Sequence, residues 1–443
     1  MALTDRSVYA TVTTGNKDRL PRGGIRLRPE PVPSQPPYAR FPVARRSLLK
    51  ATLAGFATPV LAGACGGDST TRTGTAEEIP SPDNPVRWAL SDTHEVIESG
   101  LTPERGSTLR IYNYADYLSP GVLKDFEKRY DVDIRLSTFN DADEALTKVA
   151  SKNLRFDLYF PSYDSLGRLV QADLLRPLNR DYLTNAGNLW PGLQDPWYDR
   201  GSRYTVPYTV YSTGIGWRTD KVGADIPAMD NPYDVFWDQK YAGKLAILDD
   251  WHTAMAMVLL RNGQHDINST DPDDIAMVRE QLLELRDTMR PRVTISMYTD
   301  LPAGQYGLCQ MWSGDAINTP YYLPRNTSVD IMRFWFPEDG RGEVDNDLVV
   351  CLGQGENPVA AHVFMNELLD DRIAERNFGY TGYQPPLTRF TPETLVSDGY
   401  VPENLATAVV KQSDFETGVP LLQLPAAADA AYHQIWQEFK AGG

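Results

Sequence analysis

The fold is decided by residues 109–160, which read LRIYNYADYLSPGVLKDFEKRYDVDIRLSTFNDADEALTKVASKNLRFDLYF. Apolar side chains here recur first with the two-residue period of a strand and then with the spacing of a helical face. This sequence of strand, helix, strand, helix, strand is the βαβ pattern that builds a mostly parallel sheet. The predicted elements are strand 109–111, helix 122–130, strand 134–138, helix 146–149 and strand 156–160.

The rest of the body continues the mixture of helices and strands. Asp271 and Pro272 are typical of a helix start, and apolar residues then hold helical spacing to Met289. Together these segments predict a two-lobed α/β protein. The other predicted elements are strand 329–335, strand 348–352, a helix capped by Asn357-Pro358, and a helix face at 432–439.

Composition excludes several classes of protein. The 443 residues carry a formal net charge of −16, which does not suit a binder of nucleic acid. No run of 18 or more apolar residues is present, so the sequence contains no conventional membrane span. Three cysteines are too few for a disulfide scaffold. We therefore expect a globular protein of two or three ordinary domains.

The charge is divided along the chain, because residues 1–64 have a net charge of +7 and the remainder has −23. This division predicts an export leader over 1–64. Ala44-Arg45-Arg46-Ser47-Leu48-Leu49-Lys50 resembles a twin-arginine motif, and Leu61-Ala62-Gly63-Ala64-Cys65 resembles a lipoprotein cleavage box. Lipidation of Cys65 would anchor the mature protein to the outer face of the cytoplasmic membrane. The alternative is an ordinary secretory leader in which Cys65 occurs by chance.

Residues 65–106 are interpreted as a lipidated tether. Gly, Ser and Thr dominate residues 66–75, a composition typical of flexible linkers. Val86, Trp88 and Leu90 alternate with other residues, so this part is expected to lie extended along the folded body.

Four predicted strand ends carry a carboxylate beside an aromatic or hydroxyl group. In sheets of this kind ligands bind outside the carboxyl ends of the strands. A carboxylate gives an organic cation charge-assisted hydrogen bonds, and an aromatic face attracts an ammonium group. The alternative is that the carboxylates cap helices and the aromatic rings are simply half-buried. The four clusters are Asn113-Tyr114-Ala115-Asp116-Tyr117, Pro161-Ser162-Tyr163-Asp164, Asp249-Asp250 and Trp312-Ser313-Gly314-Asp315.

From about residue 107 to 443 the chain resembles the spermidine/putrescine-binding family of bacterial solute-binding proteins. The order and spacing of several motifs carry the resemblance, since no single one is specific. They are the segment 109–117, Phe156-Asp157-Leu158-Tyr159-Phe160-Pro161-Ser162, Val206-Pro207-Tyr208, Gly214-Ile215-Gly216, Ala242-Gly243-Lys244-Leu245, Met311-Trp312-Ser313-Gly314, Asn377-Phe378-Gly379-Tyr380 and Phe439-Lys440-Ala441-Gly442.

The resemblance implies a two-lobed periplasmic-binding-protein-like fold that closes on a polyamine and delivers it to an ABC permease and ATPase. It implies no cofactor, no metal and no catalysis, and we expect a monomer. The lobes are expected at 107–209 plus 348–400 and at 210–347 plus 401–443. The ligand-binding residues expected from the strand ends and the resemblance are Tyr114, Asp116, Tyr117, Ser162, Asp164, Asp250, Trp312, Asp315 and Tyr383.

The sequence departs from the family at two acidic positions. The second acid, three residues after Asp250, is Thr253, and an expected aromatic-x-acid pattern reads Val344-Asp345-Asn346. Asp345 and Asp347 flank that position, and Asp315 adds a carboxylate where the family has a small residue. The acidic groups are therefore redistributed, which leaves open a receptor for another amine or an amino-acid derivative.

Two further alternatives concern chemistry at individual residues. His252 lies beside Asp250, so a surface hydrolase is the third hypothesis, although the sequence contains no nucleophile elbow or phosphate loop. Cys309 and Cys351 both lie in apolar strand-like runs, where they form either a disulfide or two separate buried thiols.

Overall fold

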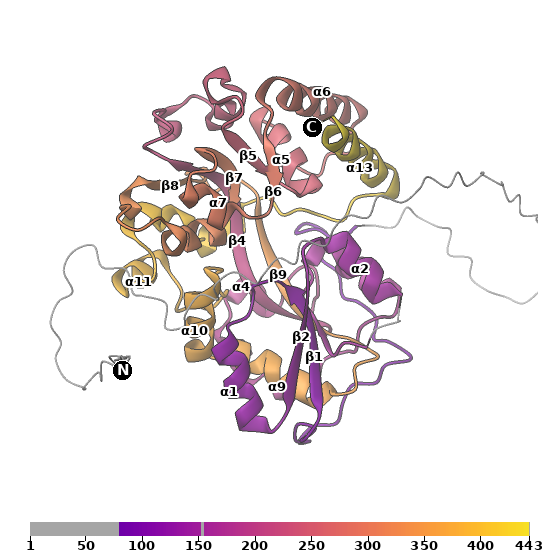
Figure 1. The fold of residues 1–443 in the computed structure, drawn as a ribbon. Helices are drawn as coiled ribbons and strands as arrows, with labels where there is room; N and C mark the ends of the chain where they lie inside the picture. Colours follow the sequence, from indigo (N-terminus) through magenta and orange to yellow (C-terminus); the bar gives the residue numbers. More distant parts are fainter. Residues whose placement is uncertain (1–78, 152–154, 443) are drawn as a thin grey trace, which may run out of the picture.

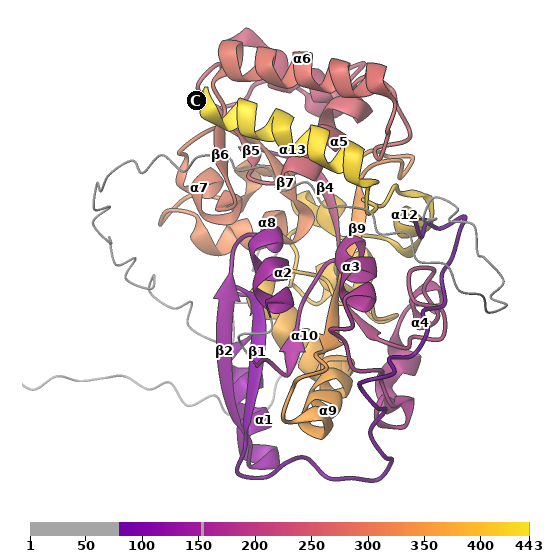
Figure 2. The same ribbon diagram turned by 90° about the vertical axis from the view of Figure 1, so that its right-hand side faces the viewer.

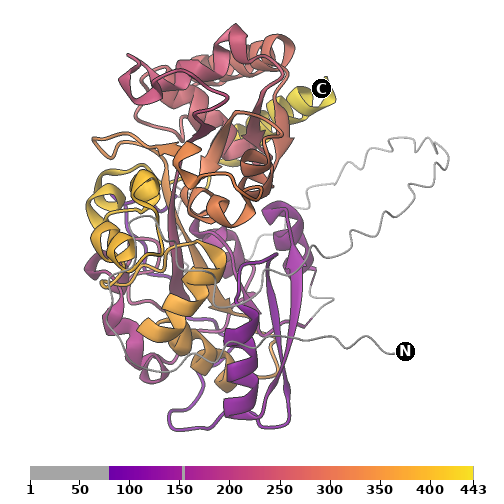
Figure 3. The ribbon, with the colours of Figure 1, turned by 60° about the vertical axis from the view of Figure 1, so that its left-hand side comes forward.

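The computed structural model describes residues 79–151 and 155–442, which form two lobes connected by long strands (Figure 1). Figure 3 shows the same two-lobed shape from another side. The predicted leader, with Arg45, Arg46 and the lipidation candidate Cys65, lies outside the described residues. The residue boundaries expected for the leader, the tether and the two lobes stay predictions.

The first lobe is built on three parallel strands, with β1 between β2 and β3. Leu109 of β1 lies opposite Ile134 of β2, as the alternation of apolar residues requires. The first helix begins where Ser119 accepts a hydrogen bond from the Val122 amide and Pro120 fills the first position. The elements are β1 (Thr108–Tyr114), α1 (Pro120–Tyr130), β2 (Asp133–Phe139), α2 (Ala142–Ala150) and β3 (Leu158–Tyr159).

The second lobe repeats this plan with β5 between β6 and β7, all parallel. Helices α5, α6 and α13 pack against one another on this lobe, and α6 and α13 lie side by side in Figure 2. As expected, Asp271 caps α6 and Pro272 is its first residue. The elements are β5 (Leu245–Leu248), α5 (Trp251–Arg261), α6 (Pro272–Met289), β6 (Arg292–Thr294), α7 (Met297–Ala303), β7 (Leu308–Trp312), β8 (Met332–Trp335) and α13 (Ala426–Ala441).

Two strands join the lobes. β4 (Thr205–Arg218) pairs over residues 205–212 with β9 (Val344–Cys351), and its remaining residues pair with β7 and β8. Every pairing that involves β4 or β9 is antiparallel, which sequence periodicity could not show. The α/β class with parallel strands inside each lobe is therefore confirmed, and the strands that join the lobes run against them.

The remaining helices cover the sheet. Helix α9 packs on β9, and α10 packs beside α1 on the first lobe. Among the described residues, no helix has both the length and the apolar character needed to cross a membrane. The elements are α3 (Leu166–Gln171), α4 (Pro191–Gln194), α8 (Ser313–Asn318), α9 (Pro358–Leu368), α10 (Asp371–Thr381), α11 (Pro392–Ser397) and α12 (Gln412–Thr417).

Residues 79–106, here called the N-terminal strap, lie along the first lobe. The Val86 amide donates to the Trp197 carbonyl at 2.8 Å, and the Trp88 indole donates to the Tyr198 carbonyl at 2.8 Å. The expectation of an extended segment on the body is therefore confirmed for Val86 and Trp88. The side chain of Leu90 does not share their burial, since it is 49% exposed.

Three local expectations change in the structure. Cys309 and Cys351 are buried in β7 and β9 and are not bonded to each other, so the disulfide alternative is wrong. Asn357 stands at the start of α9, but its amide donates to the Thr108 carbonyl and its side chain does not cap the helix. The strand expected at 329–335 begins at Met332, because a short 3₁₀ turn precedes it.

Gly214 lies where β4 enters the second lobe, and it is packed closely against the neighbouring strand β8. A Cβ atom at this position would overlap the carbonyl oxygen of Trp335 in the paired strand β8. We expect Gly214→Ala to lower the free energy of unfolding by about 1–3 kcal/mol, because the backbone of β8 has to shift. Gly192→Ala is the matched control, since an added Cβ there meets no atom within 4 Å. Equal urea midpoints for the two variants would contradict this packing.

Candidate ligand-binding cleft

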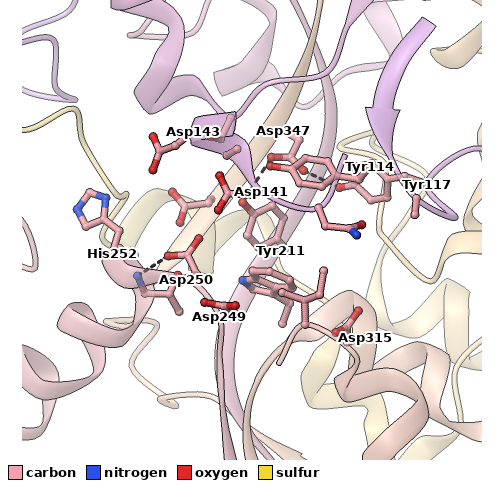
Figure 4. Close-up of a pocket in the computed structure, with 18 of the residues that line it drawn as sticks. Tyr114, Tyr117, Asp141, Asp143, Tyr211, Asp249, Asp250, His252, Asp315 and Asp347 are labelled. Carbon is pink, nitrogen blue, oxygen red and sulfur yellow. Dashed lines mark hydrogen bonds between the residues drawn. The ribbon is translucent and has the colours of Figure 1, made fainter. Parts of the chain in front are cut away.

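A cleft of about 920 Å³ lies between the lobes. Its walls come from the loop after β1, the loop after β3, the first turns of α5 and α8, and the strands β4 and β9 (Figure 4). The loops after β1 and β3 and the starts of α5 and α8 follow the ends of parallel strands in both lobes, where sheets of this class place their ligands. The volume is that of a small-molecule site.

The structure brings all nine ligand-binding residues expected from the sequence to this one cleft. They come from four separate strand ends and from the segment after α10, so the expectation that these clusters converge agrees with the geometry. Asp116 lies on the rim, where it is exposed and accepts a hydrogen bond from the Tyr380 hydroxyl at 3.3 Å. The nine are Tyr114, Asp116, Tyr117, Ser162, Asp164, Asp250, Trp312, Asp315 and Tyr383.

Asp250 has both of the roles that the sequence analysis gave as alternatives, which are capping a helix and lining the cleft. Its side chain caps α5 by accepting a hydrogen bond from the Thr253 amide at 2.9 Å, and it also lines the cleft. Burial raises the pKa of this carboxyl to about 6, helped by the negative charge of Asp164 from the opposite lobe. Asp164 in turn accepts a hydrogen bond from Ser162 at 2.5 Å.

Asp315 lies in the first turn of α8, on the other side of the cleft from His252 and Asp143 in Figure 4. One of its oxygens accepts a hydrogen bond from the Tyr383 hydroxyl at 3.0 Å, whereas Oδ2 is buried without a partner. Burial raises its pKa to about 7. A buried carboxylate oxygen without a donor is unfavourable, so this position is suited to a cationic donor from a ligand.

Aromatic rings form one wall of the cleft. The ring of Tyr117 meets those of Tyr114 and Tyr383 edge to face, with centroids 5.8 and 4.9 Å apart. Tyr211 of β4 meets Trp312 and Tyr383 in the same way, at 6.4 and 6.0 Å. Edge-to-face packing leaves ring faces available to an ammonium group or to the methylenes of a ligand.

A row of acids at β9 lines the cleft, although the sequence analysis named only Asp345 and Asp347 of this row and did not count them among the ligand-binding residues. Glu343 directly precedes the strand, and Asp345 and Asp347 follow at two-residue intervals, so their side chains share the face that lines the cleft. The period-two spacing of the acids was the available signal. It was not used for the site, and neither was Tyr211, which lies in the long strand β4.

Carboxylates outnumber fixed positive charges along the described lining. Lys440 is paired with Asp249 at 2.9 Å, and Arg168 lies 3.9 Å from Asp143. No group of His, Cys, Asp and Glu in the described part of the chain is arranged to hold a metal ion. The cleft is therefore strongly negative. The carboxylates that line it are Asp116, Asp141, Asp143, Asp164, Asp249, Asp250, Asp300, Asp315, Glu343, Asp345 and Asp347.

Two lobes joined by strands around a small-molecule cleft define a two-lobed solute-binding protein. Residues 121–400 match the family described as bacterial extracellular solute-binding protein, and the chain belongs to this family.

Similar proteins cover most of the chain. The spermidine/putrescine-binding periplasmic protein of Escherichia coli is 25% identical over 354 residues, which is 78% of this chain and 94% of that protein. The putrescine/agmatine-binding protein of Pseudomonas aeruginosa is 25% identical and covers 76% of this chain and 92% of its own length. The solved structure of a spermidine/putrescine ABC transporter protein from Listeria monocytogenes has a TM-score of 0.65 at 22% identity, covering 75% and 98% of the two chains. This last likeness confirms the fold.

The buried acids make the stability of the ligand-free protein depend on pH. Burial raises the pKa values of Asp315 and Asp347 to about 7 in the folded state, above the unfolded value near 4. The folded protein therefore binds more protons than the unfolded chain between these values, and its stability falls as pH rises through 7. We expect a lower urea midpoint at pH 8.5 than at pH 6.5. The buried histidines His252 and His362, whose pKa values are lowered by folding, oppose this fall only near pH 6.5, where the unfolded chain still loses their protons.

Asp315→Asn is the control for this pH dependence, because it removes one titrating carboxyl and keeps the shape of the side chain. The fall in midpoint between pH 6.5 and pH 8.5 should be smaller in this variant. A ligand-free protein that is equally stable or more stable at pH 8.5 would rule out buried, protonated acids in the cleft.

Proposed function

We propose that this protein is the extracytoplasmic substrate-binding component of an ABC importer and captures a linear polyamine in the cleft between its lobes. The observation that carries the proposal is the set of carboxylates that face the cleft beside aromatic rings, with Asp315 and Asp347 buried and Asp250 half-buried. Among the described residues none of these three acids has an ion pair to Lys or Arg. A slender organic cation supplies the missing charge and also packs on the rings.

Binding without chemistry agrees best with the geometry. Asp164 and Asp250 belong to different lobes, and the two acids are close enough for the charge of one to raise the pKa of the other. A ligand ammonium between them contacts both lobes at once. Because such a contact forms only when the lobes are closed, the ligand favours the closed state through its higher affinity for it.

The relatives support the same substrate class, since their names specify spermidine, putrescine, agmatine or cadaverine. From this we infer delivery of the solute to an ABC permease and ATPase by a monomeric receptor. The second candidate is a receptor of the same shape for another amine or an amino-acid derivative, and Thr253 in place of an acid favours it.

The hydrolase alternative gains no support from the site. The Asp250 carboxylate is engaged by the Thr253 amide, and the His252 ring is stacked on Trp251 with centroids 4.5 Å apart. Burial lowers the pKa of His252, which agrees with a neutral ring packed in the wall of the cleft.

A panel of solutes tests the proposed function by thermal shift. Putrescine, spermidine or spermine at 100 times its dissociation constant should add about 2.7 kcal/mol to the free energy of unfolding. Amino acids and sugars should leave the midpoint unchanged. Stabilisation by an amino-acid derivative alone would favour the second candidate, and the absence of a shift with every polyamine would refute the first.

The variant Asp250→Asn, measured with the same solutes, tests whether this acid binds the polyamine. Asparagine is as good a helix cap as aspartate, so the variant keeps α5 and removes only the charge. We expect polyamine affinity to fall about tenfold to a hundredfold, the loss typical of a charged hydrogen bond. Asp287→Asn is the matched control, because Asp287 pairs with Arg286 on the exposed surface of α6. Equal affinity in both variants would exclude Asp250 from the site.

We further propose that the protein is exported through its twin-arginine motif and anchored by lipid on Cys65. Cys65→Ala should move the protein from the membrane fraction to the soluble extracytoplasmic fraction, because the acyl chains that hold it are absent. Arg45→Lys combined with Arg46→Lys should retain the precursor in the cytoplasm. A Cys65→Ala protein that stays with the membrane would contradict lipid anchoring.

A further inference from the structure

Glu343 and Asp345, in the acid row at β9, line the cleft but are not among the ligand-binding residues expected from the sequence. Strand alternation turns Val344, Asn346 and Leu348 to the opposite side, where Val344 and Leu348 join the core of the first lobe and Asn346 donates to the Tyr198 hydroxyl at 3.1 Å. Glu343 and Asp345 therefore face the cleft as consecutive acids on one strand face. Their side chains are buried, with exposed fractions of 2% and 4%.

The protein satisfies these acids only in part. Glu343 Oε1 accepts hydrogen bonds from the hydroxyls of Thr213 and Thr253, at 2.6 and 3.0 Å. Asp345 Oδ1 accepts from the Tyr163 hydroxyl and from the Leu421 amide at 3.0 Å. Asp345 Oδ2 is buried and has no hydrogen-bond partner. All these donors are neutral, so none balances the charge of the carboxylate.

Asp347, two residues further along, differs from this pair. Both of its oxygens accept hydrogen bonds, from the hydroxyls of Tyr117 at 2.8 Å and Tyr211 at 3.5 Å. The lysine and the arginine of the described lining do not supply the missing charge, since Lys440 pairs with Asp249 and Arg168 lies 3.9 Å from Asp143. Besides Asp315, whose Oδ2 also lacks a partner, the need for a cation therefore lies at the pair of Glu343 and Asp345.

We propose that Glu343 and Asp345 form an additional ammonium-binding subsite, so that the cleft favours linear amines with three or more positive charges over diamines. This inference rests on the proposed polyamine-binding function. A diamine that engages Asp250 and Asp315 leaves the pair without a cation, so these acids stay buried either as protonated carboxyls or as costly uncompensated charges. A third ammonium supplies that charge. Acids two residues apart on a strand are separated by about 6.6 Å, a distance comparable to that between nitrogen atoms joined by three or four methylenes.

Calorimetric titration with putrescine, spermidine and spermine tests this subsite. The unmodified protein should bind the two longer amines about tenfold or more tightly than putrescine. Glu343→Gln and Asp345→Asn keep the shape of each side chain, and each should weaken spermidine and spermine by about tenfold while changing putrescine less than about threefold. Asp287→Asn is the control, because that acid lies outside the cleft on the exposed surface of α6, where it pairs with Arg286. It should leave the preference unchanged.

Proton release gives a readout that does not depend on the folding of a variant. Burial raises the pKa values of Glu343 and Asp345, and a neighbouring negative charge adds to this, from Asp250 at Glu343 and from Glu343 at Asp345, so a ligand ammonium at this pair displaces protons. Titrations at pH 6.5 in two buffers of different ionisation enthalpy should show more protons released by spermidine than by putrescine.

The outcomes separate the two proposals. Equal affinity of the unmodified protein for putrescine and spermidine, or an equal loss for all three amines in both variants, overturns the subsite and leaves the polyamine receptor standing. Binding of no amine at all overturns both.

Discussion

The site depends on one constraint, which is that carboxylates of like charge are held together away from water without a cation from the protein. Each of Asp315, Asp345 and Asp347 receives hydrogen bonds from tyrosine hydroxyls, and Glu343 receives them from threonines. These neutral donors reduce the cost of burial but leave the charges uncompensated. A small cation can therefore compensate these charges, since in the described lining Lys440 and Arg168 already face other acids, Asp249 and Asp143.

The strands that join the lobes also carry the site. Tyr211 belongs to β4, and Asp345 and Asp347 belong to β9, whereas Asp164 and Asp250 come from opposite lobes. A ligand bound against β9 therefore contacts the same strands that join the lobes. If the lobes close on the ligand as proposed, these contacts act directly on the equilibrium between open and closed forms.

Much of the fold and most of the site could be predicted from the sequence, for a physical reason. Between residues 109 and 160 apolar periodicity is set by burial, and the ends of the resulting strands place Tyr114, Ser162 and their neighbours at one edge. The antiparallel course of β4 and β9 is a long-range pairing that leaves no local period. Asp345 and Asp347 were recognised as acids beside a family position but were not placed in the site, because charged residues that alternate along a strand usually face solvent, and only tertiary packing buries them here.

The N-terminal strap has a mechanical consequence. Its hydrogen bonds attach it to the first lobe: Val86 and Trp88 donate to the carbonyls of Trp197 and Tyr198, and the Glu104 carboxylate accepts from the first amides of α9. Any pull on the N-terminal end of the chain is thus delivered to that lobe. If the protein is tethered from this end and closes as proposed, the first lobe is held in place. The second lobe, which carries Asp250 and Trp312, then moves towards the first lobe and the ligand.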